Sequence, residues 1–364
     1  MAIKKTELYS SLWASCNELR GGMDASQYKN YILTLLFVKY VSDKYAGKKL
    51  GAIVVPEGGC FADMLAQKGQ KDIGDQLNKI VGKLATENDM AWLSNPDNDF
   101  NNEDRLGKGK AMVDTLTSLV SIFENLELGK NRADGDDLLG DAYEYLMRHF
   151  ATESGKSKGQ FYTPSEVSRI LSKILGISHQ TRQDETVYDP TCGSGSLLLK
   201  VNDEAPGGLT LYGQEKDNSN AALAKMNMIL HDSPSADIWQ DDTLAEPHWK
   251  NKDGGLKAFD YAVANPPFSY KSWSSGLKVA DDPFKRFEYG EPPEKNGDYA
   301  FLLHIIKSLK STAKGAVILP HGVLFRGNAE ADIRRNIVKQ AISKGSSDYQ
   351  PTCFMARAFP PASL

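Results

Sequence analysis

The chain has 364 residues, of which 41% are hydrophobic and 25% are charged; these fractions are ordinary for a globular protein and argue against global disorder. Its length predicts about two to three domains. The formal net charge of −4 disfavours a protein that grips nucleic acid through a broad surface of its own, because such surfaces are usually basic.

The sequence shows no sign of export, of a membrane span or of a metal site. No apolar run approaches the roughly 18 residues that span a bilayer, and the first residues, MAIKKTELYS, lack the apolar core of a signal peptide. The four cysteines are far apart and form no CxxC pair, which disfavours disulfides and zinc. They are Cys16, Cys60, Cys192 and Cys353. We expect a cytoplasmic protein without a membrane segment or a bound metal.

Residues 1–155 are predicted to form a helical N-terminal domain. Asp24 and Gln27 have the spacing of a capping box at a helix start, and an apolar stripe follows them. A second stripe of the same period lies between Asp136 and Phe150. The stripes consist of Tyr28, Ile32, Leu35, Leu36 and Lys39, and of Leu139, Tyr143, Leu146, Met147 and Phe150. Both stripes predict a helical core, and nothing in this domain carries chemistry.

A loop is predicted from Ser154 to Gly159, and a well-marked helix start follows it. Thr163 is a suitable N-cap, Pro164 suits the first helical position, and Glu166 completes a capping box. Capping does not explain the Gln-Phe-Tyr that precedes the cap. The whole segment reads Gln160-Phe161-Tyr162-Thr163-Pro164-Ser165.

From Thr186 onward short strands alternate with helices, which predicts a parallel sheet with helices on both faces. Helices are predicted from Leu197 and over Asp217–Leu230. The predicted strands are Thr186–Tyr188, Leu209–Gly213, Ala236–Gln240 and Phe259–Ala264.

A glycine-rich turn follows the first predicted strand. Such a turn lets the backbone approach a ligand beside a helix N-terminus. It lacks the Gly-Lys-Ser/Thr of a P-loop and the usual dinucleotide fingerprint, and its leading carboxylate favours a cationic or hydroxyl-bearing ligand. Cys192, inside the turn, is interpreted as a packing residue. The turn reads Asp189-Pro190-Thr191-Cys192-Gly193-Ser194-Gly195-Ser196.

The next two strands also end in acidic residues. Glu215 lies about 20 positions beyond the glycine-rich turn, where a carboxylate can bind the hydroxyl pair of a ribose. Asp242 follows the third strand. Because the carboxyl ends of parallel strands meet at the ligand-binding edge, one ligand rich in hydroxyl, amino and exocyclic NH₂ groups would explain all three acidic ends. S-adenosyl-L-methionine (AdoMet) has those groups.

The fourth predicted strand ends in Asn265-Pro266-Pro267-Phe268. Two prolines cannot continue a central strand, so a rigid turn is expected at the sheet edge. That turn would present the Asn265 side-chain oxygen beside a backbone carbonyl. Such a pair can accept both hydrogens of a planar NH₂ group and leave its lone pair free to attack a methyl group. Phe268 can stack on the ring that bears the amine.

In this order, the motifs resemble those of the amino-methyltransferases that modify adenine N6 in DNA. The chain looks most like the modification (methyltransferase) subunit of type I restriction–modification systems. The family's cofactor motifs match residues 160–165 and 189–196 together with Glu215 and Asp242, and its catalytic tetrapeptide matches residues 265–268. Later matches are Asn296-Gly297-Asp298-Tyr299-Ala300-Phe301 and a strand, Gly315–Pro320, followed by His321-Gly322-Val323-Leu324.

The resemblance implies a mechanism and a set of partners. A target adenine would be flipped out of duplex DNA, with Asn265 and the Pro266 carbonyl holding its amine in line with the methyl group of AdoMet. Catalysis would be positioning and electrostatic support without a metal. A separate DNA-specificity subunit would read the sequence, and a second copy of the modification subunit would flank it. The restriction/translocase subunit would carry nuclease and motor activity.

The resemblance also implies an α/β fold class, in which a doubly wound, Rossmann-like AdoMet-dependent methyltransferase domain follows the helical N-terminal domain. The predicted domains are residues 1–155, 156–345 and a divergent or truncated tail, 346–364. The stretch from Ala341 to Leu364 lacks the strand pattern of the relatives. We therefore expect a truncated or out-of-frame C-terminus without the closing strands of the sheet.

Three alternatives stay open at this point. The same turn could methylate another amine, such as a protein glutamine or an RNA guanine, or the chain could be a catalytically impaired scaffold of the same complex. A dehydrogenase is poorly supported by the spacing of the glycine-rich turn.

In the irregular stretch Lys271–Lys295, Lys285 and Arg286 are candidate contacts to DNA, and a merely solvated loop is the other interpretation.

Overall fold

The computed structural model describes residues 5–20, 25–48, 50–128, 132–133, 136–137, 143, 145–147, 163, 165–178, 181–343 and 352–357. The chain divides into two compact units, residues 1–158 with 226–234 and residues 159–225 with 235–364. The domain limits that the sequence suggests, residues 155 and 345, stay predictions.

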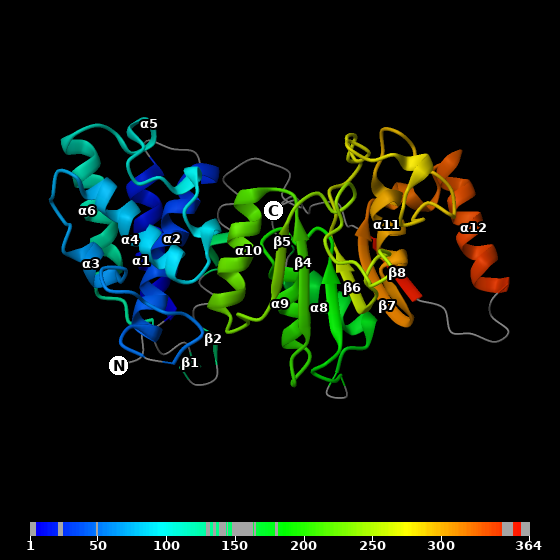
Figure 1. The fold of residues 1–364 in the computed structure, drawn as a ribbon, viewed down its shortest axis with the longest axis horizontal. Helices are drawn as coiled ribbons and strands as arrows, with labels where there is room; N and C mark the ends of the chain where they lie inside the picture. Colours follow the sequence, from blue (N-terminus) through cyan, green and yellow to red (C-terminus); the bar gives the residue numbers. More distant parts are fainter. Residues whose placement is uncertain are drawn as a thin grey trace. The chain divides into compact units, whose positions relative to one another are not determined.

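The first unit is mainly helical (Figure 1). Two-residue strands β1 (Arg132–Ala133) and β2 (Asp136–Asp137) form a small antiparallel sheet. The helices are α1 (Lys5–Arg20), α2 (Ala25–Tyr45), α3 (Phe61–Leu65), α4 (Ile73–Glu87), α5 (Glu103–Leu106) and α6 (Lys110–Glu124), with 3₁₀ turns η1 (Ala91–Leu93) and η2 (Pro96–Asn98).

Helix α2 forms the centre of this unit because it is apolar around most of its circumference, a pattern typical of a helix buried on all sides. Every member of the first apolar stripe is buried, which confirms the predicted helical core. The stripe includes Lys39, whose ammonium donates a hydrogen bond to Asp43 Oδ1 at 2.7 Å. Thr34 Oγ1 accepts a hydrogen bond from Asn98 Nδ2 at 2.9 Å, which ties α2 to η2.

The second predicted helix, Asp136–Phe150, is wrong at its start. Asp136 and Asp137 pair with Ala133 and Arg132 as β2, and the Asp-Gly dipeptide between the two strands is a strong hairpin signal. Tyr143 and residues 145–147 are helical, and Tyr143, Leu146 and Met147 are buried. Leu139 and Phe150 lie outside the described residues.

The second unit is built on a parallel sheet with the order β5-β4-β3-β6-β7-β8, so the predicted α/β fold is confirmed. The first strand, β3, lies inside the sheet; β4 and β5 follow on one side of it, and β6 is its neighbour on the other side. This is the strand order of doubly wound folds. The strands are β3 (Thr186–Asp189), β4 (Thr210–Glu215), β5 (Asp237–Gln240), β6 (Phe259–Ala264), β7 (Leu309–Leu319) and β8 (Thr352–Arg357).

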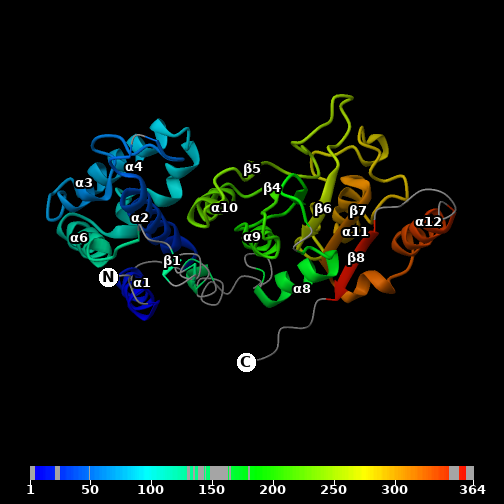
Figure 2. The same cartoon turned by 90° about the horizontal axis from the view of Figure 1, so that it is seen from below.

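Helices cover both faces of this sheet. Helices α8 and α9 lie side by side on one face, where α8 contacts β7 and α9 contacts β3, β4 and β6 (Figure 2). Helix α11 packs against β7. The helices of this unit are α8 (Ser165–Leu175), α9 (Ser196–Asp203), α11 (Asp298–Lys307) and α12 (Ala329–Ser343), with 3₁₀ turns η3 (Val279–Asp281) and η4 (His321–Leu324). The division between the units falls within a further helix, α10 (Asn218–Leu230).

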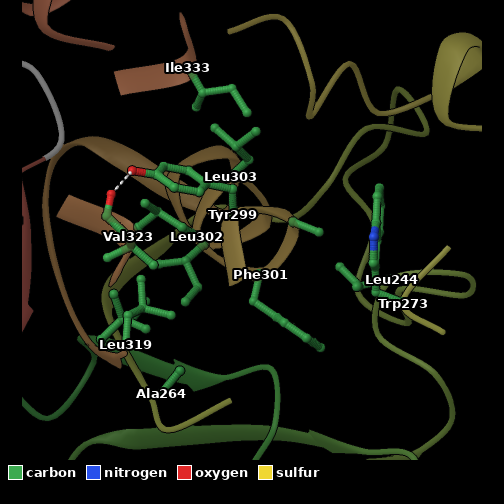
Figure 3. Packing of buried hydrophobic residues seen from close by; sticks show 14 of the residues in the cluster. Leu244, Ala264, Trp273, Tyr299, Phe301, Leu302, Leu303, Leu319, Val323 and Ile333 are labelled. Atoms are coloured by element: carbon green, nitrogen blue, oxygen red, sulfur yellow. Dashed lines mark hydrogen bonds between the residues drawn. The ribbon is translucent and has the colours of Figure 1, made fainter. Parts of the chain in front are cut away.

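Residue alternation along the strands separates the two buried faces. Ala262 and Ala264 of β6 share one hydrophobic cluster with Val317 and Leu319 of β7, together with α11 and Ile333 of α12 (Figure 3). Residues between them, such as Val263, are buried but outside this cluster. Since successive side chains of a strand point to opposite faces, both faces of the central strands carry a core, which is typical of parallel sheets.

One expectation about the end of the chain is wrong. The stretch after Ala341 does contain a strand, because residues 352–357 pair in parallel with residues 314–319 of β7 as β8. Helix α12 supplies the crossover that two parallel neighbours require. Local sequence alone did not reveal β8, because a strand is defined by its hydrogen-bonded partner. Within the described part of the chain, no helix is long and apolar enough to cross a membrane.

Candidate active site

The strands that carry the candidate residues are neighbours in the sheet. In the order β5-β4-β3-β6 all run in the same direction, so their carboxyl ends meet at one edge. Four candidate residues lie at those ends or within two residues after them: Asp242, Glu215, Asp189 and Asn265. The connection reverses direction between β3 and β6, and this is where doubly wound folds bind their ligands.

The glycine-rich turn is closed against the end of β4. Gly193 and Gly195 have φ of 54° and 78°, a left-handed conformation that side chains with a Cβ rarely adopt. The Gly193 N–H donates to Glu215 Oε2 at 2.9 Å. Ser194 and Ser196 are buried, and their hydroxyls are 2.9 Å apart. Cys192 is also buried, and burial raises the pKa of its thiol, as expected of a packing residue.

Asp189 is the most deeply buried acid of this edge, with 1% of its surface exposed. Its Oδ1 accepts hydrogen bonds from the Thr191 N–H at 2.9 Å and from the Thr191 hydroxyl at 3.4 Å. Burial raises the pKa of the Asp189 carboxyl to about 7, and the nearby charge of Glu215 adds to the rise. A buried carboxyl with such a pKa favours a cationic partner, because the partner's charge would replace the lost hydration.

Glu215 is held in place by backbone donors. Its Oε1 accepts from the Asp217 N–H at 2.9 Å while its Oε2 accepts from Gly193. Burial raises the pKa of this carboxyl, and both backbone hydrogen bonds oppose the rise. The carboxylate is therefore oriented before any ligand binds.

Asp242 has a partner that sequence reasoning missed. Its Oδ1 accepts from the Leu244 N–H at 2.9 Å, and its Oδ2 lies 2.7 Å from the ammonium of Lys216. Lys216 also donates to the Tyr270 hydroxyl at 3.4 Å. This hydrogen-bonded Asp242 raises the pKa of Lys216. One lysine thus links the ends of β4 and β5 with the loop after β6.

The proline-rich turn follows β6 at the predicted place. Asn265 is half-buried and its Nδ2 donates to Thr163 Oγ1 at 3.2 Å. That hydrogen bond orients the amide, since the nitrogen faces Thr163. Pro266 is buried, Pro267 is half-buried, and Phe268 keeps 39% of its surface exposed, so its ring is accessible for stacking.

The glycine of the Asn296-Gly297-Asp298 segment allows close packing behind this turn. The Gly297 N–H donates to the Tyr270 carbonyl at 3.0 Å. A Cβ at Gly297 would lie 2.7 Å from the Trp273 Cβ and 3.2 Å from the Tyr270 carbonyl oxygen. The backbone after the Asn265–Phe268 turn can therefore approach α11 only where no side chain intervenes.

The stretch Lys271–Lys295 is mostly exposed or half-buried, as expected of a solvated loop, but a few of its side chains, among them Trp273, Arg286 and Phe287, are buried. Arg286 is 1% exposed and pairs with Asp282, whose carboxylate accepts from Nη2 at 2.8 Å and from Nε at 3.0 Å. The expectation that Arg286 contacts DNA is wrong, since its charge is already neutralised inside the protein. Trp273 is also buried, and its indole donates to the Pro293 carbonyl at 2.9 Å. Lys285 is exposed and its role stays a prediction.

Part of the predicted cofactor segment lies outside the described residues, namely Gln160, Phe161, Tyr162 and Pro164. Thr163 is buried beside Asn265, and Ser165 is the first residue of α8. Over the residues that the structure describes, no group of three or more His, Cys, Asp or Glu side chains is arranged to hold a metal ion.

A doubly wound parallel sheet with acids at three adjacent strand ends and an Asn-Pro-Pro-Phe turn at the fourth defines a Rossmann-like methyltransferase. The model of the N-6 DNA Methylase family matches residues 134–356, and that of the HsdM N-terminal domain matches residues 8–123. The chain belongs to the N-6 DNA methylase family, among the methylase subunits of type I restriction–modification systems.

Individual relatives agree with this assignment. The methylase subunit of the type I restriction enzyme MpnII from Mycoplasma pneumoniae is 29% identical over 93% of this chain and 73% of its own length. The MjaVII methylase subunit from Methanocaldococcus jannaschii is 31% identical over 85% of this chain but only 56% of its own length. The chain therefore spans only part of these relatives.

A solved structure supports the same fold. The type I restriction-modification system methyltransferase subunit from Streptococcus thermophilus superposes with a TM-score of 0.80 at 30% identity, covering 93% of this chain and 79% of that one.

Proposed function

We propose that this chain transfers a methyl group from AdoMet to N6 of an adenine flipped out of duplex DNA. A separate DNA-specificity subunit would supply the target sequence. The observation that carries the proposal is the Asn265–Phe268 turn at the end of β6, beside the β3 end that holds Asp189. The turn offers acceptors for an amine at the point where the sheet offers acids for a cofactor.

The residues at the sheet edge fit AdoMet by their chemistry. Asp189, with its raised pKa, suits the ammonium group at the amino-acid end of the cofactor. Glu215, oriented by two backbone N–H groups, suits the ribose hydroxyl pair. Asp242 suits the exocyclic amine of the cofactor's adenine. The glycine-rich turn 193–195 lets the backbone come close to the ligand. Residues 160–162 and 164 are proposed to complete this site.

The chain's own groups would act on the target amine. When bound, AdoMet would supply an electrophilic methyl group on its sulfonium. Asn265 Oδ1 and the Pro266 carbonyl would each accept one hydrogen of the adenine amine, which concentrates electron density on the nitrogen that attacks. Phe268 would hold the base by stacking. These interactions position the amine and support the positive charge that develops on it, and the surplus proton would leave to solvent.

The proposed partners follow from family membership. They are duplex DNA, the DNA-specificity subunit, a second copy of this chain and, in the full complex, the restriction/translocase subunit. The net charge of −4 supports this division of labour, because an acidic chain needs a partner to supply much of the contact to phosphates.

A methyl-transfer assay tests the proposal. Labelled AdoMet is incubated with unmethylated duplex DNA, with and without the cognate specificity subunit, and the products are digested to nucleosides. We expect N6-methyladenine only with the partner. The variant Asn265→Ala should lose at least about 100-fold in rate, as expected when a positioned polar group is removed. The matched control Asn251→Ala, in an exposed turn, should keep its activity.

The alternatives predict other outcomes. A labelled protein glutamine or RNA guanine would identify another amine as the substrate. Tight binding of AdoMet without product in either mixture would favour the scaffold.

A further inference from the structure

A single buried carboxylate holds the backbone directly behind the catalytic turn. The N–H of Ser269, the residue after Phe268, donates to Asp298 Oδ1 at 2.7 Å. Asp298 is the first residue of α11 and is fully buried, with 0% of its surface exposed. Twenty-nine positions separate the two residues in the chain, so only the fold brings them together.

The other oxygen of the same carboxylate binds an arginine from the next strand connection. Arg326 Nη2 donates to Asp298 Oδ2 at 2.6 Å, and Arg326 Nε donates to Glu330 Oε2 at 2.6 Å. Glu330 is 2% exposed and belongs to α12. The Asp298 N–H is held in turn by Asn296 Oδ1 at 3.0 Å. Asp298 therefore joins the turn after β6 to the segment after β7.

Ser269 needs such a partner because of its backbone conformation. It has φ of 50°, a left-handed conformation that residues with a Cβ rarely adopt. A strained residue persists only where the surroundings hold it. The hydrogen bond to an ionised acceptor is of the stronger kind, and Arg326 supplies the charge that a buried carboxylate requires.

We propose that Asp298 is a positioning residue for methyl transfer, acting through the Ser269 N–H to fix the far end of the Asn265–Phe268 turn. This inference rests on the proposed function. Asp298 touches neither the acids of the cofactor edge nor the amine acceptors. Its loss should move the turn without changing the affinity for AdoMet.

The neighbouring acid provides a matched control. Asp298→Asn and Glu330→Gln each neutralise one buried carboxylate that lies 2.6 Å from Arg326. Of the two, Asp298 is the one that accepts the hydrogen bond from the Ser269 N–H. Amide exchange of peptides covering residues 268–270 is followed by mass spectrometry in the full chain. For Asp298→Asn we expect exchange faster by at least about tenfold, as for a lost charged hydrogen bond. For Glu330→Gln we expect little change.

Kinetics in the complex with DNA and the specificity subunit give the second readout. Asp298→Asn should lower kcat by about 10- to 100-fold, the range expected when reacting groups are slightly misplaced, with an unchanged Kd for AdoMet. Glu330→Gln should stay within about threefold of wild type in kcat, even though it also breaks a buried ion pair.

Several results would overturn the inference. Unchanged exchange at residues 268–270 in Asp298→Asn, or equal effects of both variants, would reduce the carboxylate to a general stabilising role. If Asp298→Asn does not fold, Asn296→Ala replaces it, with a smaller increase of exchange and a smaller fall of kcat expected; no change in either would refute the idea. A wild-type complex without methyl transfer would refute the proposed function instead, and the exchange measurement would still decide the positioning of the turn.

Discussion

The affinity for AdoMet should depend on pH through Asp189. Burial raises the pKa of this carboxyl to about 7. Below that pH it is mostly protonated and neutral, and above it the charge needed to bind a cation is present. With this pKa, the ionised fraction of the Asp189 carboxyl is about 0.1 at pH 6 and about 0.9 at pH 8. The Kd for AdoMet should therefore fall about tenfold between these values.

Calorimetry checks both parts of this reasoning. Titrations of AdoMet in buffers of different ionisation enthalpy should reveal release of about 0.9 proton per site at pH 6 and about 0.1 at pH 8. The variant Asp189→Asn has no proton to lose at this position, so it should bind more weakly without that release. Any ionisation of the ligand itself is common to both proteins. A Kd that stays constant from pH 6 to 8, or an equal pH dependence in the variant, would refute the assignment of Asp189 to a cationic group.

Three further predictions concern packing and charge. Gly297→Ala should lower the free energy of unfolding in urea by about 1–3 kcal/mol, because the new methyl group meets backbone and side-chain atoms; an unchanged midpoint would contradict this packing. Arg286→Leu should lower the free energy of unfolding by about 3–5 kcal/mol, because it leaves the buried Asp282 carboxylate unpaired. If Arg286 contacted DNA instead, its loss would alter DNA binding and leave the unfolding curve unchanged. Lys216→Met should weaken AdoMet binding about threefold to fivefold, which is the scale of an exposed ion pair. The control is Lys310→Met, because Lys310 is also paired at 2.7 Å but lies at the opposite edge of the sheet, and this variant should leave the AdoMet affinity unaltered. Equal effects of the two variants would argue against a role of Lys216 in the site.

The order of strands and helices in the second unit could be predicted because the signals are local. The predicted strand Phe259–Ala264 agrees with β6 at both ends, and the predicted helix Asp217–Leu230 differs from α10 by one residue. Longer deviations occur where packing extends an element. Strand β7 begins at Leu309, whereas the resemblance to the family implied a strand only from Gly315. Its first half is mostly exposed, so no apolar run marked it.

Long charged side chains were the least predictable part. Arg286 and Lys285 are adjacent and look equivalent in the sequence, yet Arg286 is buried in an ion pair and Lys285 is exposed. A guanidinium can be buried only where a carboxylate meets it with suitable geometry. Asp282 provides that geometry through the way the loop folds over α11, which no spacing rule describes.

The sequence by itself determined which residues stand at the strand ends and that parallel strands bring those ends to one edge. Each motif is contiguous, and its geometry follows from nearest neighbours in the chain. Only the tertiary structure decided the contacts between these motifs: Gly193 with Glu215, Lys216 with Asp242, and Ser269 with Asp298. The physical reason is that hydrogen bonds and ion pairs act over about 3 Å, whereas these partners are separated by tens of residues and meet only after the sheet has formed.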